Sequence, residues 1–290
     1  MLTLVEKRRL KSPPTDIKHI EDIIVISTYS NKLLFINQDL KKVKLILLRH
    51  NILSLAITED SIILCGDADG RINQIDKDGT KHKSLRVSNG PICSLFYLQD
   101  IKTMIFNDEK KVAYYDRHIK HCMYGPICAV QCVDVYDKNI VLSISQLEYS
   151  IRIYNKEQNN HSVHMIQDSG EYPEVGCFIS REYFMVGSQS GLVYLFSINK
   201  KYPVASHKIG DSITSMAYIN ENVFVGSFNG DLVILKIEEE VKEIYRTNLG
   251  GIINVIYGFE DNLLVGVGRE PRLGRWAVVK EKNMIYKFKI

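Results

Sequence analysis

A unit of about 40 residues recurs seven times along this chain of 290 residues. Each unit holds an apolar strand, a small residue, a polar turn and a second apolar strand. The copies occupy residues 24–37, 62–76, 103–116, 141–155, 184–197, 223–236 and 263–278. Repeats of this period with four short strands each are typical of propeller blades, which bury their apolar faces only by stacking on their neighbours. The period is therefore the strongest constraint on the fold.

Aligned positions support this interpretation. One position of the third strand is apolar in every unit: Leu33, Ile72, Val112, Ile151, Val193, Leu232 and Leu273. Three residues further on, the position is large and apolar: Ile36, Ile75, Tyr115, Tyr154, Phe196, Leu235 and Trp276. Candidate inner strands precede six units, at 52–57, 91–98, 130–136, 174–179, 213–219 and 252–259. The sequence predicts an all-β, seven-bladed WD40-type β-propeller with the seven third-strand positions equivalent and buried.

The repeats have lost most of their polar signature residues. The Gly-His pair that often opens such a blade survives only as Arg49-His50, and the Asp after the tryptophan position only as Asp76 and Asp116. We therefore expect apolar packing, rather than a repeated hydrogen-bonded network, to hold the blades together.

The charge is segregated along the chain. The net charge is +3, but residues 1–20 carry +3, residues 269–290 carry +5 and the interior carries −5. Closing a propeller requires one terminus to complete a blade begun by the other. Residues 2–10 and 283–290 are the two candidates for the last outer strand. We therefore predict a propeller over 16–290, with the basic segment 1–15 beside its last blade, and a basic pole where the two ends meet.

The candidate binding residues come from these basic ends. Three arginines fall within seven residues, next to the only tryptophan of the chain. Guanidinium groups fork onto phosphate or stack on bases. The candidate phosphate-binding residues here are Arg269 and Arg272 in an exposed turn, Arg275 in an interblade position, and Lys7, Arg8 and Arg9 near the N-terminus. Leu273, Gly274 and Trp276 are expected to have structural roles.

At Arg269-Glu-Pro-Arg-Leu-Gly-Arg-Trp276 the chain resembles the WD-repeat protein of the U3 small nucleolar ribonucleoprotein, the ribosomal RNA-processing protein nine family. The similar stretch covers 249–288, and a second one covers 185–205, including Lys200 and Lys201. Those two lysines are further candidates for RNA contact. The chain departs from the family in its short segment before the propeller and in Ala277, where members usually have a second tryptophan.

This resemblance implies a nucleolar, non-enzymatic component of the small-subunit processome. Its expected partners are the box B/C region of U3 small nucleolar RNA, a small kink-turn-binding protein and other processome proteins. The expected role is in pre-ribosomal RNA processing and 40S ribosome biogenesis. The alternative is a WD40 propeller adaptor that binds acidic or phosphorylated peptides in a checkpoint or chromatin complex, because basic surfaces attract both kinds of anion.

Other function classes have little support in the sequence. It lacks the GxSxG, HExxH and P-loop motifs, so we expect no catalysis and no cofactor. Asp67, Asp69 and Asp76 match a calcium loop only in part, and are interpreted as a hairpin turn. We expect no metal at the cluster formed by His118, His121, Cys122, Cys128 and Cys132. No apolar run reaches the ~18 residues of a membrane helix, so a membrane partner is not expected.

Overall fold

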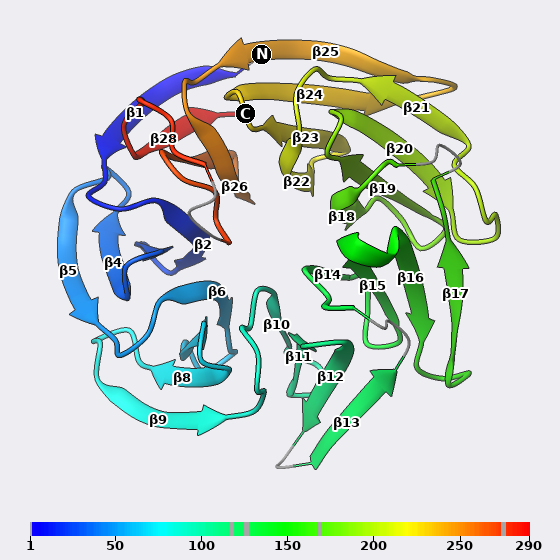
Figure 1. The fold of residues 1–290 in the computed structure, drawn as a ribbon. Helices are drawn as coiled ribbons and strands as arrows, with labels where there is room; N and C mark the ends of the chain where they lie inside the picture. The colour runs from blue at the N-terminus through cyan, green and yellow to red at the C-terminus, as the bar shows by residue number, and fades with distance from the viewer. Residues whose placement is uncertain (1, 117–118, 125–127, 167–169, 274–276) are drawn as a thin grey trace.

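The computed structural model contains seven four-stranded antiparallel sheets arranged around a central axis (Figure 1). It describes residues 2–116, 119–124, 128–166, 170–273 and 277–290. Gly274, Arg275 and Trp276 lie outside the described residues, as does His118. The all-β, seven-bladed propeller predicted from the repeat is confirmed. Within the described ranges, no helix is long and apolar enough to cross a membrane.

Six blades use four consecutive strands each. Blade one contains β2 (Pro14–Ile20), β3 (Ile23–Thr28), β4 (Lys32–Asn37) and β5 (Lys42–Leu47), and blade two contains β6 (Ile52–Ile57), β7 (Ile63–Asp67), β8 (Arg71–Ile75) and β9 (Lys81–Arg86). Blade three contains β10 (Leu95–Leu98), β11 (Thr103–Asp108), β12 (Lys111–Asp116) and β13 (Ile119–Tyr124), and blade four contains β14 (Cys132–Val135), β15 (Ile140–Ser145), β16 (Ser150–Asn155) and β17 (Asn160–His164). Blade five contains β18 (Pro173–Phe178), β19 (Tyr183–Ser188), β20 (Leu192–Ser197) and β21 (Ala205–Lys208), and blade six contains β22 (Ile213–Ile219), β23 (Asn222–Ser227), β24 (Asp231–Ile237) and β25 (Val241–Asn248).

Blade seven is built from both ends of the chain. It contains β26 (Ile252–Phe259), β27 (Asn262–Gly268) and β28 (Met284–Lys289), and its outer strand is the N-terminal β1 (Thr3–Arg9). Strands β1 and β28 pair antiparallel, from Thr3 opposite Lys289 to Arg9 opposite Met284. Figure 1 shows them side by side near the marked termini. The two basic ends therefore meet in one sheet.

The third strand of blade seven differs from the sequence prediction. We expected it within 263–278, with Leu273 buried, but that expectation is wrong. Residues 269–273 and 277–283, the described part of the connection between β27 and β28, form no strand; Leu273 is 40% exposed, and β28 takes the place of the third strand. Ile285 lies opposite Gly266, as Leu33 lies opposite Ser27 in blade one, and it is fully buried. Ile285 therefore occupies, in blade seven, the buried position that the aligned apolar residues such as Leu33 occupy in the other blades.

The other six members of the column occupy the predicted positions. Leu33, Ile72, Val112, Ile151, Val193 and Leu232 are at most 1% exposed. The apolar clusters join neighbouring blades: Leu10, Ile17, Leu264 and Ile285 pack together between blades seven and one. Burial on both faces explains why these third strands are almost continuously apolar.

Hydrogen bonds between inner strands supplement this packing. The sequence led us to expect packing without a repeated polar network, yet inner-strand side chains bond the backbone of the next blade. These contacts are Asp16 Oδ2 with Leu55 N–H (2.7 Å), Ser54 Oγ with Ile92 O (2.8 Å), Ser94 Oγ with Val133 N–H (3.1 Å), Asp134 Oδ2 with Phe178 N–H (2.8 Å) and Ser215 Oγ with Ile253 O (3.0 Å). They satisfy backbone groups beside the axis that no sheet partner reaches.

Candidate nucleic-acid interface

The topology gives the propeller two distinct faces. Successive strands of a blade run in opposite directions, so its connections alternate between the faces. We call upper the face that carries the loops between second and third strands and the loops between blades. The lower face carries the remaining turns. Residues 10–13, between β1 and β2, and the described residues between β27 and β28, 269–273 and 277–283, therefore share the upper face of blade seven.

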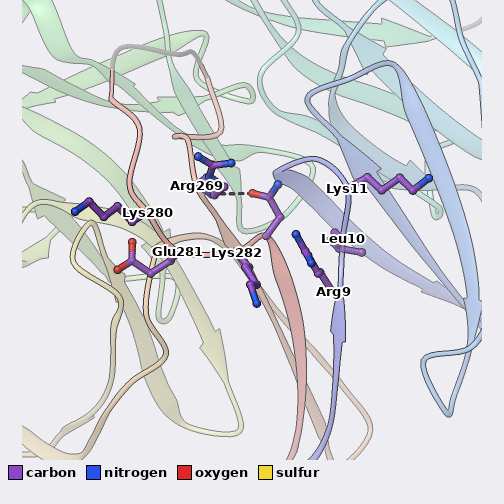
Figure 2. A pocket seen from close by; sticks show the side chains of 8 residues that line it. Arg9, Leu10, Lys11, Arg269, Lys280, Glu281 and Lys282 are labelled. Atoms are coloured by element: carbon purple, nitrogen blue, oxygen red, sulfur yellow. Dashed lines mark hydrogen bonds between the residues drawn. The ribbon is translucent and has the colours of Figure 1, made fainter.

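These two loops form a basic pocket of about 670 Å³. Figure 2 shows its side chains, with Lys11 and Lys280 extending to opposite sides of Arg269. Five cationic residues line it: Arg9, Lys11, Arg269, Lys280 and Lys282. Leu10, Glu281 and Asn283 complete the lining. We refer to this set of residues as the basic pocket.

Asn283 holds the two sides of the basic pocket together. Its carbonyl oxygen accepts a hydrogen bond from Leu10 N–H (2.8 Å), and its side-chain Oδ1 accepts one from Arg269 N–H (2.8 Å). Val279 N–H also donates to the carbonyl of Arg269 (2.8 Å). Because Asn283 is only 8% exposed, these bonds fix Arg9 and Arg269 on one rigid frame.

The cations of the basic pocket are not neutralised by the protein. Across the described ranges, none of the five forms an ion pair, and Glu281 is the one acidic residue of the lining. Arginines elsewhere on the upper side are paired: Arg71 with Asp69 and Arg152 with Glu148, each at 3.1 Å. Unpaired guanidinium and ammonium groups on a fixed backbone are suited to bind phosphate groups.

The predicted site residues separate into several environments. Arg9 and Arg269 line the basic pocket, and the exposed Lys7 lies on the same face of β1 as Arg9. Arg8 points to the other face, where its guanidinium donates to the carbonyl of Leu40 in blade one, so it joins two blades. Because side chains alternate between the two faces of β1, Lys7 and Arg9 lie on one face and Arg8 lies on the other.

Arg272 and the blade-five lysines lie away from the basic pocket. Arg272 and Leu273 line the central channel, together with Cys93 and Cys132. Lys200 and Lys201 are exposed in the turn between β20 and β21, on the lower face. The carbonyl of Lys200 accepts a hydrogen bond from His164 Nδ1 (2.8 Å). The structure therefore does not bring these lysines together with Arg269.

Sequence reasoning missed Lys11, Lys280, Lys282 and Asn283 as members of the site. The three lysines contribute to the charge of the two ends, but only the structure shows that they line one pocket. Asn283 carries no charge, and its role is visible only from its two hydrogen bonds.

The candidate calcium loop makes structural contacts. Asp67 Oδ1 accepts hydrogen bonds from the N–H groups of Asp69 (3.0 Å) and Arg71 (2.9 Å), which closes the hairpin turn at Gly70. Gly70 has a φ of 76°, as this turn requires. Within the described ranges, no three His, Cys, Asp or Glu residues are grouped so that they could hold a metal ion.

The central channel has a volume of about 1250 Å³ and contains two carboxyl groups with raised pKa values. Burial raises the pKa of Glu174 to about 7, although a hydrogen bond from Gln146 Nε2 (2.5 Å) opposes the shift. Burial also raises the pKa of Asp134 to about 6, opposed by the N–H groups of Phe178 and Val135. Protonation of these groups is therefore linked to folding.

We expect this linkage to appear in the pH dependence of stability. The folded-state pKa of Glu174 exceeds its ordinary value of 4.5, so its contribution to stability is present at low pH and is lost as the pH rises towards 7. Glu174→Gln should therefore remove part of the gain in unfolding free energy that the wild type shows between pH 8 and pH 5. Denaturant titrations of both proteins at several pH values measure this difference. Parallel pH profiles would contradict the assignment.

Comparisons with known proteins agree with this fold. A curated relative, the U3 snoRNP-associated protein-like EMB2271 of Arabidopsis thaliana, is 26% identical over 271 residues. The match covers 80% of this chain and 55% of the relative, so the chain spans about half the length of that protein. No family model matches the chain.

Solved structures give the same result for the architecture. The structure of U3-55K has a TM-score of 0.88 at 17% identity, covering 100% of this chain and 98% of that one. The crystal structure of the RRP9 WD40 repeats has a TM-score of 0.88 at 18% identity, covering 99% and 97%. The WD40 propeller domain of Doa1 has a TM-score of 0.83 at 14% identity, covering 99% and 97%. The resemblance to the U3 ribonucleoprotein WD-repeat proteins is confirmed.

Proposed function

We propose that this chain is a non-enzymatic component of the U3 small nucleolar ribonucleoprotein that binds U3 RNA through the basic pocket of blade seven. It acts in the small-subunit processome, in pre-ribosomal RNA processing and 40S ribosome biogenesis, and it resides in the nucleolus. The name of the curated relative supports the assembly, and the propeller supplies a rigid surface for it.

The observation that carries the proposal is the group of five cations in the basic pocket, none of which pairs with an acidic side chain in the part of the chain that the structure describes. RNA binding draws much of its free energy from cations that replace condensed counterions on phosphates. By contrast, Arg71 and Arg152 of two other upper-face loops are already paired with carboxylates. Arg9 and Arg269 are therefore the central phosphate contacts, with Lys7, Lys11, Lys280 and Lys282 around them.

The family resemblance supports more specific partners. We assign the box B/C region of U3 RNA as the ligand, with a small kink-turn-binding protein and other processome proteins as neighbours on the same face. In this arrangement Arg272, which lines the central channel and not the basic pocket, lies next to the bound RNA rather than under its phosphates.

A salt titration with paired variants tests the site. We expect Arg269→Ala/Lys282→Ala to weaken binding of a box B/C RNA at 150 mM salt by about tenfold or more. It should also flatten the slope of log affinity against log salt by about one for each phosphate that the variant no longer neutralises. Mobility-shift assays over a range of salt concentrations measure both effects.

The matched control removes the same charge from the lower face. Lys200→Ala/Lys201→Ala should leave the affinity and the salt slope nearly unchanged, and both variants should melt within a few degrees of the wild type. If the lower-face variant alone loses RNA binding, the interface lies on the other face. If neither does, and an acidic phosphopeptide binds the basic pocket while RNA does not, the adaptor function replaces the proposal.

A further inference from the structure

The upper mouth of the central channel carries two acidic side chains that do not line the basic pocket. Glu174 on β18 and Asp211 in the loop between β21 and β22 line it, from blades five and six. In the described residues, neither carboxylate forms an ion pair; Glu174 bonds Gln146, and Asp211 Oδ1 accepts from Ser212 N–H (2.7 Å). Lys18 and Arg272 also line this cavity, but Lys18 is paired with Asp16, and neither Glu174 nor Asp211 has an ion-pair partner among the described residues.

The other acidic residues of the channel are already occupied. Asp16 and Asp134 accept backbone hydrogen bonds from the next blade, and Asp16 also lies 3.5 Å from Lys18 Nζ. Their role is to join the inner strands. Glu174 and Asp211 are different, because their contacts leave acceptor capacity on each carboxylate.

A β-bulge places Glu174 at the wall of the channel. The register of β18 with β19 shifts between Pro173 and Val175, so Glu174 is the extra residue. Bulges re-aim a side chain without ending the strand. The same shift occurs between Ile253 and Val255 in blade seven and makes Asn254 the extra residue there. Both side chains line the channel.

Asn254 provides a second, independent indication of a ligand site. It is 2% exposed, and its Nδ2 donates to the carbonyl of Glu270 (2.9 Å). Its Oδ1 is buried and accepts no hydrogen bond from any residue in the described ranges. At the equivalent bulge in blade six, Thr214 is satisfied by the carbonyl of Ile253 (2.6 Å). A buried acceptor without a donor is costly, and a ligand rich in donors would satisfy it.

We infer that the channel mouth binds a basic side chain, arginine or lysine, from an extended segment of a partner protein. Glu174 and Asp211 supply the negative charge, and Gln146 orients the Glu174 carboxylate. Asn254 supplies a neutral acceptor from blade seven. Burial favours the protonated form of Glu174, and a cation would restore its charged form. The upper face thus offers separate sites: cations for RNA at blade seven, and acceptors for a basic peptide at blades five and six.

The test uses the full chain and a defined probe. The probe is a fluorescein-labelled dodecapeptide of glycine and serine with arginine at four positions, and its control carries citrulline at those positions. Citrulline keeps the shape of arginine but has no charge. We expect saturable 1:1 binding of the arginine peptide by fluorescence anisotropy, and binding at least about tenfold weaker for the citrulline peptide.

Paired variants locate the peptide. Glu174→Gln should weaken binding of the arginine peptide by about tenfold. Glu182→Gln removes the same charge from the lower face of the same blade, where Glu182 is exposed, and should leave binding unchanged. The side-chain amide NMR signals of Gln146 and Asn254 should shift on addition of the peptide. Equal losses in the two variants would show only general attraction to an acidic protein and would overturn the inference.

The RNA assay separates this inference from the proposed function. Glu174→Gln should bind box B/C RNA as the wild type does, whereas Arg269→Ala/Lys282→Ala should bind the arginine peptide normally. If Glu174→Gln changes RNA affinity while the arginine peptide does not bind, the channel mouth belongs to the RNA interface and the peptide site is refuted.

Discussion

Removal of residues 1–12 is expected to abolish the cooperative thermal unfolding transition of this protein. The deletion removes β1 and leaves β28 as an exposed sheet edge in blade seven. It also removes Leu2, buried between blades six and seven, and Leu10, buried between blades seven and one. Loss of a buried leucine costs about 2–5 kcal/mol, and a domain has about 5–15 kcal/mol in total. The loss of two buried leucines and one strand is comparable with the total stability.

Calorimetry and size-exclusion chromatography measure this effect, and two controls separate the strand from its charge. Lys7→Ala/Arg9→Ala keeps β1 and both leucines, so it should melt within a few degrees of the wild type. A synthetic peptide of residues 1–12, added in excess to the truncated chain, should restore a transition, because it can pair with β28 in trans. A truncated chain that melts like the wild type would show that β1 does not support closure.

The repeat was sufficient to predict six blades because each is local in sequence. Strands β6 and β22 were expected at 52–57 and 213–219, and the structure places them at Ile52–Ile57 and Ile213–Ile219. Burial on both faces imposes the same apolar pattern on each third strand, so alignment finds it without knowledge of the fold. Blade seven, in contrast, is not local in sequence. Its outer strand comes from the other end of the chain, and the loop 269–283 separates its second and third strands.

The charge of the two ends indicated where a site would form, but not which side chains would form it. Alternation along β1 directs Arg8 to Leu40 and leaves Lys7 and Arg9 exposed, and this phase depends on the bulge between Leu4 and Glu6. Likewise, Arg269 and Arg272 are three residues apart in sequence, yet they line different cavities. The backbone conformation between Arg269 and Arg272, rather than the local composition, places them in different cavities.

Ile285→Ala is expected to lower the free energy of unfolding by about 2–5 kcal/mol, whereas Leu273→Ala should change it by less than about 1 kcal/mol. Ile285 is fully buried among Leu10, Ile17 and Leu264 at the closure between blades seven and one. Alanine there leaves a cavity that the surrounding strands cannot fill. Leu273 is 40% exposed in the loop, so its truncation loses little buried surface.

Urea unfolding of the two variants beside the wild type measures both values. The pair is matched in size and lies within one stretch of the sequence, but the aligned repeat and the structure assign the buried position to different residues. A large loss for Leu273→Ala with a small one for Ile285→Ala would restore the strand first expected within 263–278. The result expected from the structure would show that the seventh repeat is interrupted. In that case the described part of 269–283 contributes no strand to the propeller, and it can present Arg269, Lys280 and Lys282 on the upper face.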